Sequence, residues 1–183
     1  MEAEGSHRAI GSGAGMGRCG GWAIDLFLGH CTRHHHDIEI AVAAHRFPEV
    51  AAALSEIECD VVGDGWSWPY PAALDRFRQT WLRDPVSGLF LLDVFREQHA
   101  EVTWTYRRDP TIALPYAEAC MKTSDGVPHL IPELVPLLKA HTVLSKDQAD
   151  FDAVLPALSA ARRHRLGDWL TRTHPSHPWL EAL

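Results

Sequence analysis

Two carboxylates at alternate positions stand at the start of an apolar stretch. Asp37 and Glu39 flank Ile38 and are followed by Ile40 in the segment DIEI. In a β-strand, residues two apart lie on the same face, so both acids would project together while the isoleucines enter a core. Two acids on one face repel each other unless a cation lies between them, and Mg²⁺ takes oxygen ligands of this kind. The spacing therefore predicts a magnesium site.

A glycine pair precedes these acids and a third acid follows them. Gly20 and Gly21 open the segment GGWAIDLFLG, and glycine lets a backbone approach a phosphate closely. Asp93 lies inside the apolar run LFLLDVF, where a charge is costly unless it is paired or bound to a metal. A solvated strand end is the alternative for Asp93. If its strand neighbours that of Asp37, the converging acids could hold one or two Mg²⁺ ions and align a nucleoside triphosphate for in-line attack.

The elements that would position these residues follow from the apolar pattern. Strands are predicted where short apolar runs occur, and helices where apolar residues recur at helical spacing. Residues 66–85, which contain two prolines, give no clear element. The predicted strands are 37–42, 59–62 and 89–95, with an edge strand at 103–107, and the predicted helices are 21–29, 48–55, 133–140, 148–155 and 163–171.

Three regions are expected along the chain. Residues 1–18 are rich in Gly, Ser and Ala and predict a flexible leader. Residues 19–127 mix predicted strands and helices and form the α/β part. Residues 128–183 form a helical C-terminal part.

Composition narrows the class of protein. The chain has 183 residues and a net charge of −7 from 24 acids and 17 bases, which argues against nonspecific binding to a nucleic-acid backbone. The four cysteines form no CxxC pair, so we expect reduced thiols and a cytoplasmic location. No apolar run approaches the roughly twenty residues that span a bilayer, and membrane insertion is not expected.

Three adjacent histidines, 34–36, would point in alternating directions in an extended segment and make a poor metal site.

Together these segments resemble the nucleotidyltransferase superfamily, and within it the aminoglycoside-2''-adenylyltransferase-like family. The resemblance rests on GGWAIDLFLG, on TR-x-H-x-DIEI and on the lone acid in LFLLDVF, and it extends to the C-terminal HPWL. It implies an α+β fold, with a small mixed β-sheet flanked by helices and a helical C-terminal part. It also implies transfer of AMP from ATP to a hydroxyl of a small molecule, plausibly an aminoglycoside-like antibiotic, with release of pyrophosphate.

The resemblance assigns roles to individual residues. Gly20 and Gly21 would cradle the triphosphate. Asp37 and Glu39 would bind Mg²⁺, and Asp93 would be a metal ligand or the catalytic base. Arg33 and Lys139 are candidate phosphate contacts, with an ordinary surface charge as the alternative for each. The expected partners are a nucleoside triphosphate and a small hydroxylated acceptor.

The chain departs from the family pattern in front of the glycines. The residues GSGAGMGRC do not predict the buried strand that usually leads into the glycine pair. Glu39 also stands where Asp is common in this branch, although the superfamily accepts either acid. A member that binds nucleotide or a partner without catalysis is therefore a second hypothesis, and an enzyme that modifies a protein or a tRNA end is a third.

Overall fold

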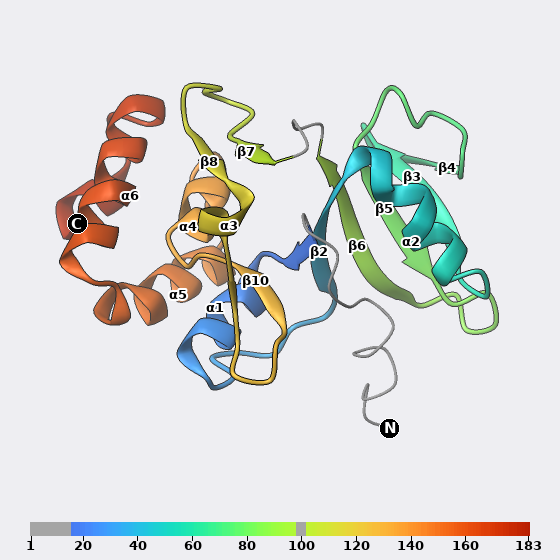
Figure 1. The fold of residues 1–183 in the computed structure, drawn as a ribbon, viewed down its shortest axis with the longest axis horizontal. Coiled ribbons are helices and arrows are strands. Elements are labelled where there is room, and N and C mark those ends of the chain that lie inside the picture. Colours follow the sequence, from blue (N-terminus) through green and yellow to red (C-terminus); the bar gives the residue numbers. More distant parts are fainter. Residues whose placement is uncertain (1–15, 98–101) are drawn as a thin grey trace. The chain divides into compact units, whose positions relative to one another are not determined.

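The structure is a computed structural model, and it describes residues 16–97 and 102–183. The predicted leader lies outside this range, apart from residues 16–18. The chain divides into two compact units, shown in Figure 1. The first unit comprises residues 1–18 and 36–102, and the second comprises residues 19–35 and 103–183. The expected boundary was at 127–128, whereas residues 19–35, which contain the glycine pair, and residues 103–127 group with the C-terminal residues.

A mixed β-sheet forms the first unit. Its strands follow one another in the order β4-β3-β5-β6-β2-β1. Strands β2 and β6 are parallel, and the other neighbouring pairs are antiparallel. The expected α+β class with a small mixed sheet is confirmed. The strands are β1 (Met16–Arg18), β2 (Ile38–Ala43), β3 (Glu58–Gly63), β4 (Trp66–Pro69), β5 (Gln79–Arg83) and β6 (Phe90–Glu97).

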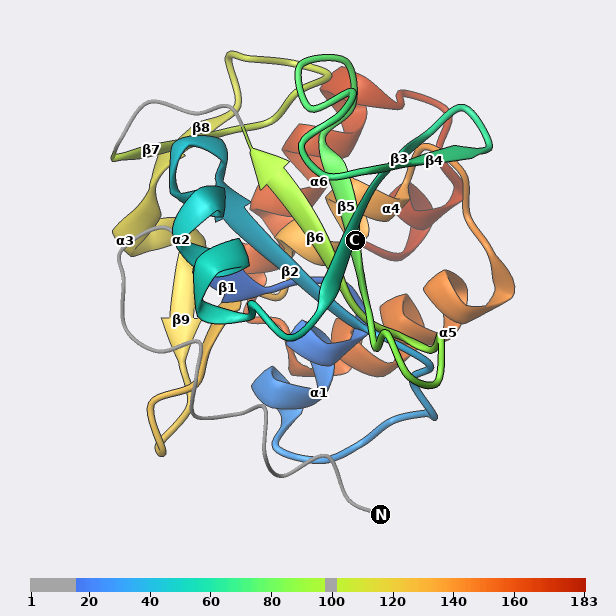
Figure 2. The same ribbon diagram turned by 90° about the vertical axis from the view of Figure 1, so that its right-hand side faces the viewer.

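One face of this sheet carries the hydrophobic core of the unit. Helix α2 (Phe47–Ala53) covers that face and lies on the near side of the strands in Figure 2. The helix has Pro48 in its first turn, where the missing N–H has no intrahelical partner to lose. Alternation along the strands sends every second side chain into the core, whose buried members are Ile40, Val42, Phe47, Val50, Leu82, Leu92 and Val94.

Three strands of the sheet, β1, β4 and β5, were not expected from the sequence. Strand β1 pairs with β2 in an antiparallel register that sets Arg18 opposite Ile40, although its composition did not predict a strand. Strand β5 lies between β3 and β6, in the region that gave no clear element. Because β5 is the neighbour of β6, its side chains bear directly on Asp93.

Helices dominate the second unit. The expected helices near 21–29, 133–140, 148–155 and 163–171 are present, and their largest fully buried side chains include Ile24, Leu134, Leu137, Leu166 and Leu170. The α-helices are α1 (Gly21–Leu28), α3 (Tyr116–Ala119), α4 (Leu134–Lys139), α5 (Ser145–Val154) and α6 (Ala160–Thr173). Short 3₁₀ helices follow at η2 (Leu155–Ala157) and η3 (Pro178–Ala182), and η1 (Ala44–Arg46) precedes α2 in the first unit.

Two small antiparallel ladders complete the second unit. The predicted edge strand is present as β7 (Thr103–Thr105), which pairs with β8 (Ala113–Pro115). Strand β9 (Cys120–Lys122) pairs with β10 (Pro128–Leu130), and a turn at Asp125-Gly126 connects them. The C-terminal part is therefore not purely helical.

A buried carboxylate ties α6 to the start of α4. Glu133 is fully buried, directly before α4, and both its oxygens are paired. Arg162 Nη1 lies 2.5 Å from Glu133 Oε2, and Arg165 Nη2 pairs with Oε1. The arginine side chains keep some exposure, so the cluster joins a buried anion to two partly solvated cations.

The expectations about the cysteines and about membrane insertion can be compared with the structure. None of the four cysteines, all of which lie in the described residues, forms a disulfide. Within residues 16–97 and 102–183, no helix has the length and apolar character needed to cross a membrane.

Candidate active site

Three acids meet on the face of the first unit's sheet that lies opposite α2. Glu39 in β2 is directly opposite Asp93 in β6, and Asp37 stands just before β2. Residues paired across parallel strands point to the same face, so Glu39 and Asp93 share it, with Asp37 directly before the start of β2. The negative charges of Glu39 and Asp37 both act on Asp93. The structure thus brings the three predicted carboxylates together.

Asp93 has the most unusual environment of the three. Its side chain is buried, and Gln79 Nε2 of β5 donates a 2.6 Å hydrogen bond to Oδ2. The Trp81 side chain lies beside the carboxyl, opposite Asp93 on β5. Burial, together with the negative charges of Glu39 and Asp37, raises the pKa of Asp93 to about 7, although Gln79 and Trp81 oppose the rise. Asp93 can therefore exchange a proton near neutral pH.

The second oxygen of Asp93 bears on whether these acids fit a metal ion. Among the described residues, the buried Oδ1 atom has no hydrogen-bond partner. A buried acceptor without a partner is costly, and a cation would satisfy it. Three carboxylates supply only oxygen ligands, which suit Mg²⁺. The residues present fit the predicted ion, with Asp37 exposed and Glu39 half-buried beside the buried Asp93.

The glycine pair opens the second unit. Gly20 adopts φ 63° and ψ −153°, a region that residues with a side chain essentially never occupy. It caps the N-terminus of α1, and its carbonyl accepts a hydrogen bond from Ala23 N. Gly21 has no room for a side chain, because a Cβ there would contact the Arg33 guanidinium and would lie 2.5 Å from His35 Cε1. Both glycines are therefore required by the backbone and its packing.

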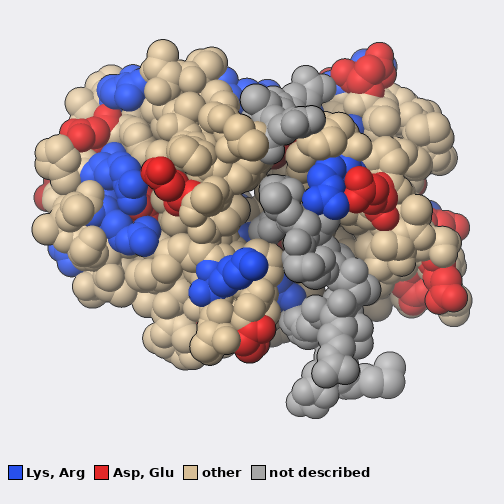
Figure 3. Space-filling view, viewed as in Figure 1, with Lys and Arg blue, Asp and Glu red and all other residues tan. Residues whose placement is uncertain are grey.

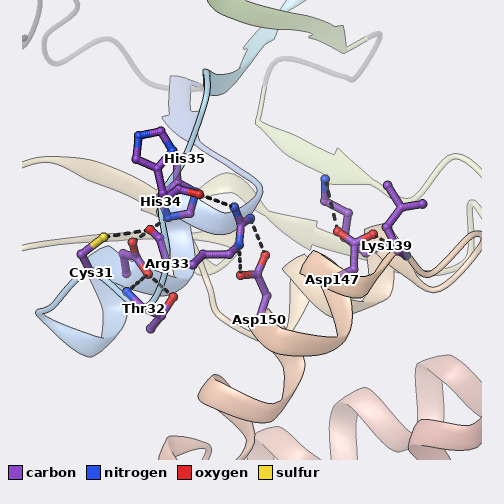
Figure 4. Close-up of polar contacts among 10 residues, drawn as sticks. Cys31, Thr32, Arg33, His34, His35, Lys139, Asp147 and Asp150 are labelled. Carbon is purple, nitrogen blue, oxygen red and sulfur yellow. Dashed lines mark hydrogen bonds and ion pairs between the residues drawn. The ribbon is translucent and has the colours of Figure 1, made fainter.

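Two predicted phosphate contacts are paired with acids of α5, as Figure 4 shows. Arg33 donates from Nε and Nη2 to the two oxygens of Asp150, at 2.7 and 2.9 Å. Hydrogen bonding to Asp150 raises the pKa of Arg33 further, against the effect of burial. Lys139 Nζ lies 3.9 Å from Asp147 Oδ1. Gly21, Arg33 and Asp150 thus form one connected group. Lys139, the last residue of α4, pairs with another acid of the same helix α5.

Asp25 orders the segment that carries Arg33. Its Oδ1 accepts hydrogen bonds from Thr32 N and Thr32 Oγ1, and its Oδ2 lies 2.7 Å from His35 Nε2. Burial raises the pKa of Asp25, but the Thr32 hydrogen bonds and the contact with His35 outweigh it, so the pKa lies below its ordinary value. Asp25 therefore caps the local backbone at Thr32.

His35, in the middle of the histidine run, enters this network through its ring. Its ring stacks on Trp22, with centroids 4.8 Å apart. The Sγ of Cys31 and the donor atoms of His35 and Asp25 lie within 4.8 Å of one another. The direct hydrogen bond between His35 and Asp25 already satisfies two of these three groups.

Charge on the surface is mixed. On the face shown in Figure 3, basic and acidic side chains are scattered among neutral ones and do not form a continuous basic stripe.

Solved structures of antibiotic adenylyltransferases share this α+β fold. The crystal structure of ANT(2'')-Ia with adenylyl-2''-tobramycin matches with a TM-score of 0.57 and 18% identity, over 86% of this chain and 88% of that chain. The solution structure of the antibiotic-resistance factor ANT(2'')-Ia gives 0.56 and 19%, over 86% and 83%. The lincomycin-bound lincosamide adenylyltransferase LnuA gives 0.53 and 18%, over 76% and 84%.

Part of the chain also matches a family model, in agreement with the resemblance seen in the sequence. The model of the aminoglycoside-2''-adenylyltransferase family matches residues 18–74. This segment contains the glycine pair, Arg33, Asp37 and Glu39, whereas Asp93 and Lys139 lie beyond it. A search of curated protein sequences finds no match.

Proposed function

We propose that this protein is a Mg²⁺-dependent nucleotidyltransferase that moves AMP from ATP to a hydroxyl group of a small molecule. One observation carries the proposal: Glu39 and Asp93 share a face of two parallel strands beside Asp37, and the buried Oδ1 of Asp93 has no hydrogen-bond partner among the described residues. A structural acid would be expected to have both oxygens satisfied.

The acids divide the chemistry between them. Asp37, Glu39 and Asp93 would hold Mg²⁺, which when bound offsets the charge of the triphosphate. The acceptor oxygen attacks the α-phosphorus of ATP, the bond to the β-phosphate breaks, and pyrophosphate leaves. In its role as base, Asp93 would take the proton of the acceptor hydroxyl.

The glycine segment is proposed to bind the triphosphate. The N-terminus of α1 has no side-chain cap, so its backbone N–H groups can donate to phosphate oxygens. Gly20 allows the backbone turn that presents them, as its dihedral angles require. Arg33 and Lys139 remain candidate phosphate contacts, and in that role they would share their charge with Asp150 and Asp147.

The acceptor is proposed to be an aminoglycoside-like antibiotic. The structures that share the fold carry an adenylylated tobramycin and a lincomycin, both hydroxylated antibiotics. The net charge of −7 favours the approach of a polycation such as an aminoglycoside. Lincomycin-like acceptors form the second group to test.

Pyrophosphate release tests the proposal directly. Purified protein is mixed with Mg-ATP and a panel of aminoglycosides and lincosamides, and pyrophosphate is measured over time. We expect turnover with at least one acceptor. Asp93→Asn should lower turnover by roughly 100-fold or more, as loss of a general base does. Asp37→Asn should also abolish most of it.

A matched control uses an acid outside the cluster. Glu49 lies on α2 and is exposed in an ion pair with Arg46, so Glu49→Gln should leave turnover unchanged. If Asp37→Asn and Asp93→Asn keep wild-type turnover, the assignment of these residues is wrong. If Mg-ATP raises the melting temperature but no acceptor gives pyrophosphate, the protein binds nucleotide without this transfer activity.

A further inference from the structure

We propose that Gln79 and Trp81 are positioning residues that hold the Asp93 carboxyl in the orientation needed for catalysis. This inference rests on the proposed function and deepens it. Neither residue lies in the segment that matches the family model, and the sequence did not predict their strand. Their contacts with Asp93 come from the pairing of β5 with β6.

The sheet places both side chains beside Asp93. Trp81 is directly opposite Asp93 in the antiparallel register, and paired residues project to the same face. Gln79 is two residues before Trp81, so it also lies on that face. Because β6 lies between β5 and β2, Asp93 has both side chains on one side and the strand of Glu39 on the other.

The hydrogen bonds make the two oxygens of Asp93 unequal. Gln79 Nε2 donates to Oδ2 at 2.6 Å, a distance typical of a strong contact. Oδ1 is buried and has no such partner among the described residues. One oxygen is thus fixed by the protein and the other is left to accept a proton or bind a cation.

Trp81 is itself held in place. The ring of Phe90 meets the Trp81 ring edge-on, with centroids 4.8 Å apart and an angle of 64° between the planes. Such aromatic pairs restrict the orientation of both rings. The indole that contacts Asp93 is therefore supported by a neighbour on the adjacent strand.

Gln79→Met tests the role of the amide. Methionine has a similar length and an unbranched side chain but cannot donate a hydrogen bond. We expect kcat to fall roughly 10- to 100-fold, while KM for Mg-ATP changes little, because the substituted group orients a catalytic carboxyl and does not bind nucleotide. Binding of Mn²⁺, followed by its electron paramagnetic resonance signal, should weaken over a similar range.

A control and a second variant keep the test decisive. Gln148→Met removes an amide on α5 that donates to Asp152 and accepts from Trp179. It should leave kcat and Mn²⁺ affinity unchanged. Trp81→Phe keeps an aromatic ring next to Phe90 and loses the N–H, so it serves if Gln79→Met does not fold, and it should weaken Mn²⁺ binding in the same direction.

The outcomes separate this inference from the proposed function. If the wild type is active and both folded variants keep its kcat and its Mn²⁺ affinity, the positioning role is wrong while the function stands. If the wild type gives no pyrophosphate with any acceptor, the proposed function fails and Mn²⁺ binding alone decides the positioning role. Wild-type protein that binds no Mn²⁺ would overturn the part of the inference that concerns the cation.

Discussion

At the scale of single residues, the buried carboxyl of Asp93 makes the stability of the folded protein depend on pH. Its carboxyl is 7% exposed, and its pKa is raised to about 7, chiefly by burial. A folded-state pKa above the unfolded value means that the folded protein holds the proton more tightly. Between about pH 4 and pH 7, unfolding therefore releases a proton. The favourable contribution of protonated Asp93 is complete below this window and is lost as the pH rises through it.

Asp93→Asn should reverse this effect. The amide stays neutral at every pH, so the variant should be more stable than the wild type at pH 8, by on the order of a few kcal/mol in the free energy of unfolding. The gain should shrink as the pH falls from 7 to 5. Denaturant unfolding in Mg²⁺-free buffer at several pH values measures it. A gain of equal size at pH 5 and pH 8 would mean that the charge on Asp93 is not its cause.

Gly21 gives a second prediction at this scale. Gly21→Ala should destabilise the protein by about 1–3 kcal/mol, because its Cβ would displace Arg33 and His35. Gly167→Ala is the matched control. A Cβ at position 167 meets only Leu183, at 3.8 Å, within helix α6, so this change should be neutral or stabilise by about 0.5–1 kcal/mol. Thermal melts of the two variants give the comparison.

At the scale of elements, the sequence predicted the helices and strands whose apolar residues recur in a clear pattern. Strands β2 and β6 and helices α1, α2, α4, α5 and α6 were expected near their observed positions. Strand β5 was missed because it has five residues, QTWLR, in a region broken by prolines, although Thr80 and Leu82 alternate inward. Strand β1 was missed because three residues carry too little pattern, and its evidence is the pairing with β2.

The same limit applies to the candidate site. Asp37, Glu39 and Asp93 could be chosen from the sequence because acids in apolar strands are conspicuous. Gln79 could not, because a glutamine in an unassigned region signals nothing without the neighbouring strand. The partner of Arg33 could not be predicted from the sequence either, since Asp150 is 117 residues away along the chain.

Helix α6 should depend on the buried carboxylate that anchors it. Glu133→Gln removes the charge that pairs with Arg162 and Arg165 but keeps the volume of the side chain. Breaking such a pair from the buried side should cost about 3–5 kcal/mol, with some reduction because both arginines are partly solvated. Urea unfolding measures the loss. Arg163→Gln, on the same helix, is the control and should cost much less, because its side chain contacts backbone carbonyls.

The C-terminal segment should contribute to the second unit in a similar way. Trp179 is buried, stacks on Phe151 of α5 with centroids 4.4 Å apart, and donates from Nε1 to Gln148. Trp179→Ala should lower the free energy of unfolding by about 3–5 kcal/mol, the range for loss of a buried aromatic side chain. Trp179→Phe should recover most of that loss. If both variants lose the same free energy of unfolding, the lost hydrogen bond and not the lost aromatic ring is the cause.

At the scale of the whole molecule, nucleotide binding should be visible as stability. A ligand that binds only the folded state stabilises it by about 2.7 kcal/mol at a free concentration one hundred times its Kd. Mg-ATP should therefore raise the melting temperature of the wild type, and chelation of Mg²⁺ should remove most of the rise. Asp37→Asn should show a smaller rise. A rise of equal size in this variant would mean that nucleotide binding does not depend on Asp37.

The division of the chain into two units has a further consequence, for synthesis on the ribosome. Helix α1 belongs to the second unit and contacts α4, α5 and β10, all of which are made much later. At roughly 5–20 residues per second, the 117 residues between Arg33 and Asp150 delay that contact by on the order of ten seconds. During this interval the apolar side chains of α1 lack their native partners. The nascent chain is then open to misassembly, and slower translation over residues 36–130 would lengthen that exposure.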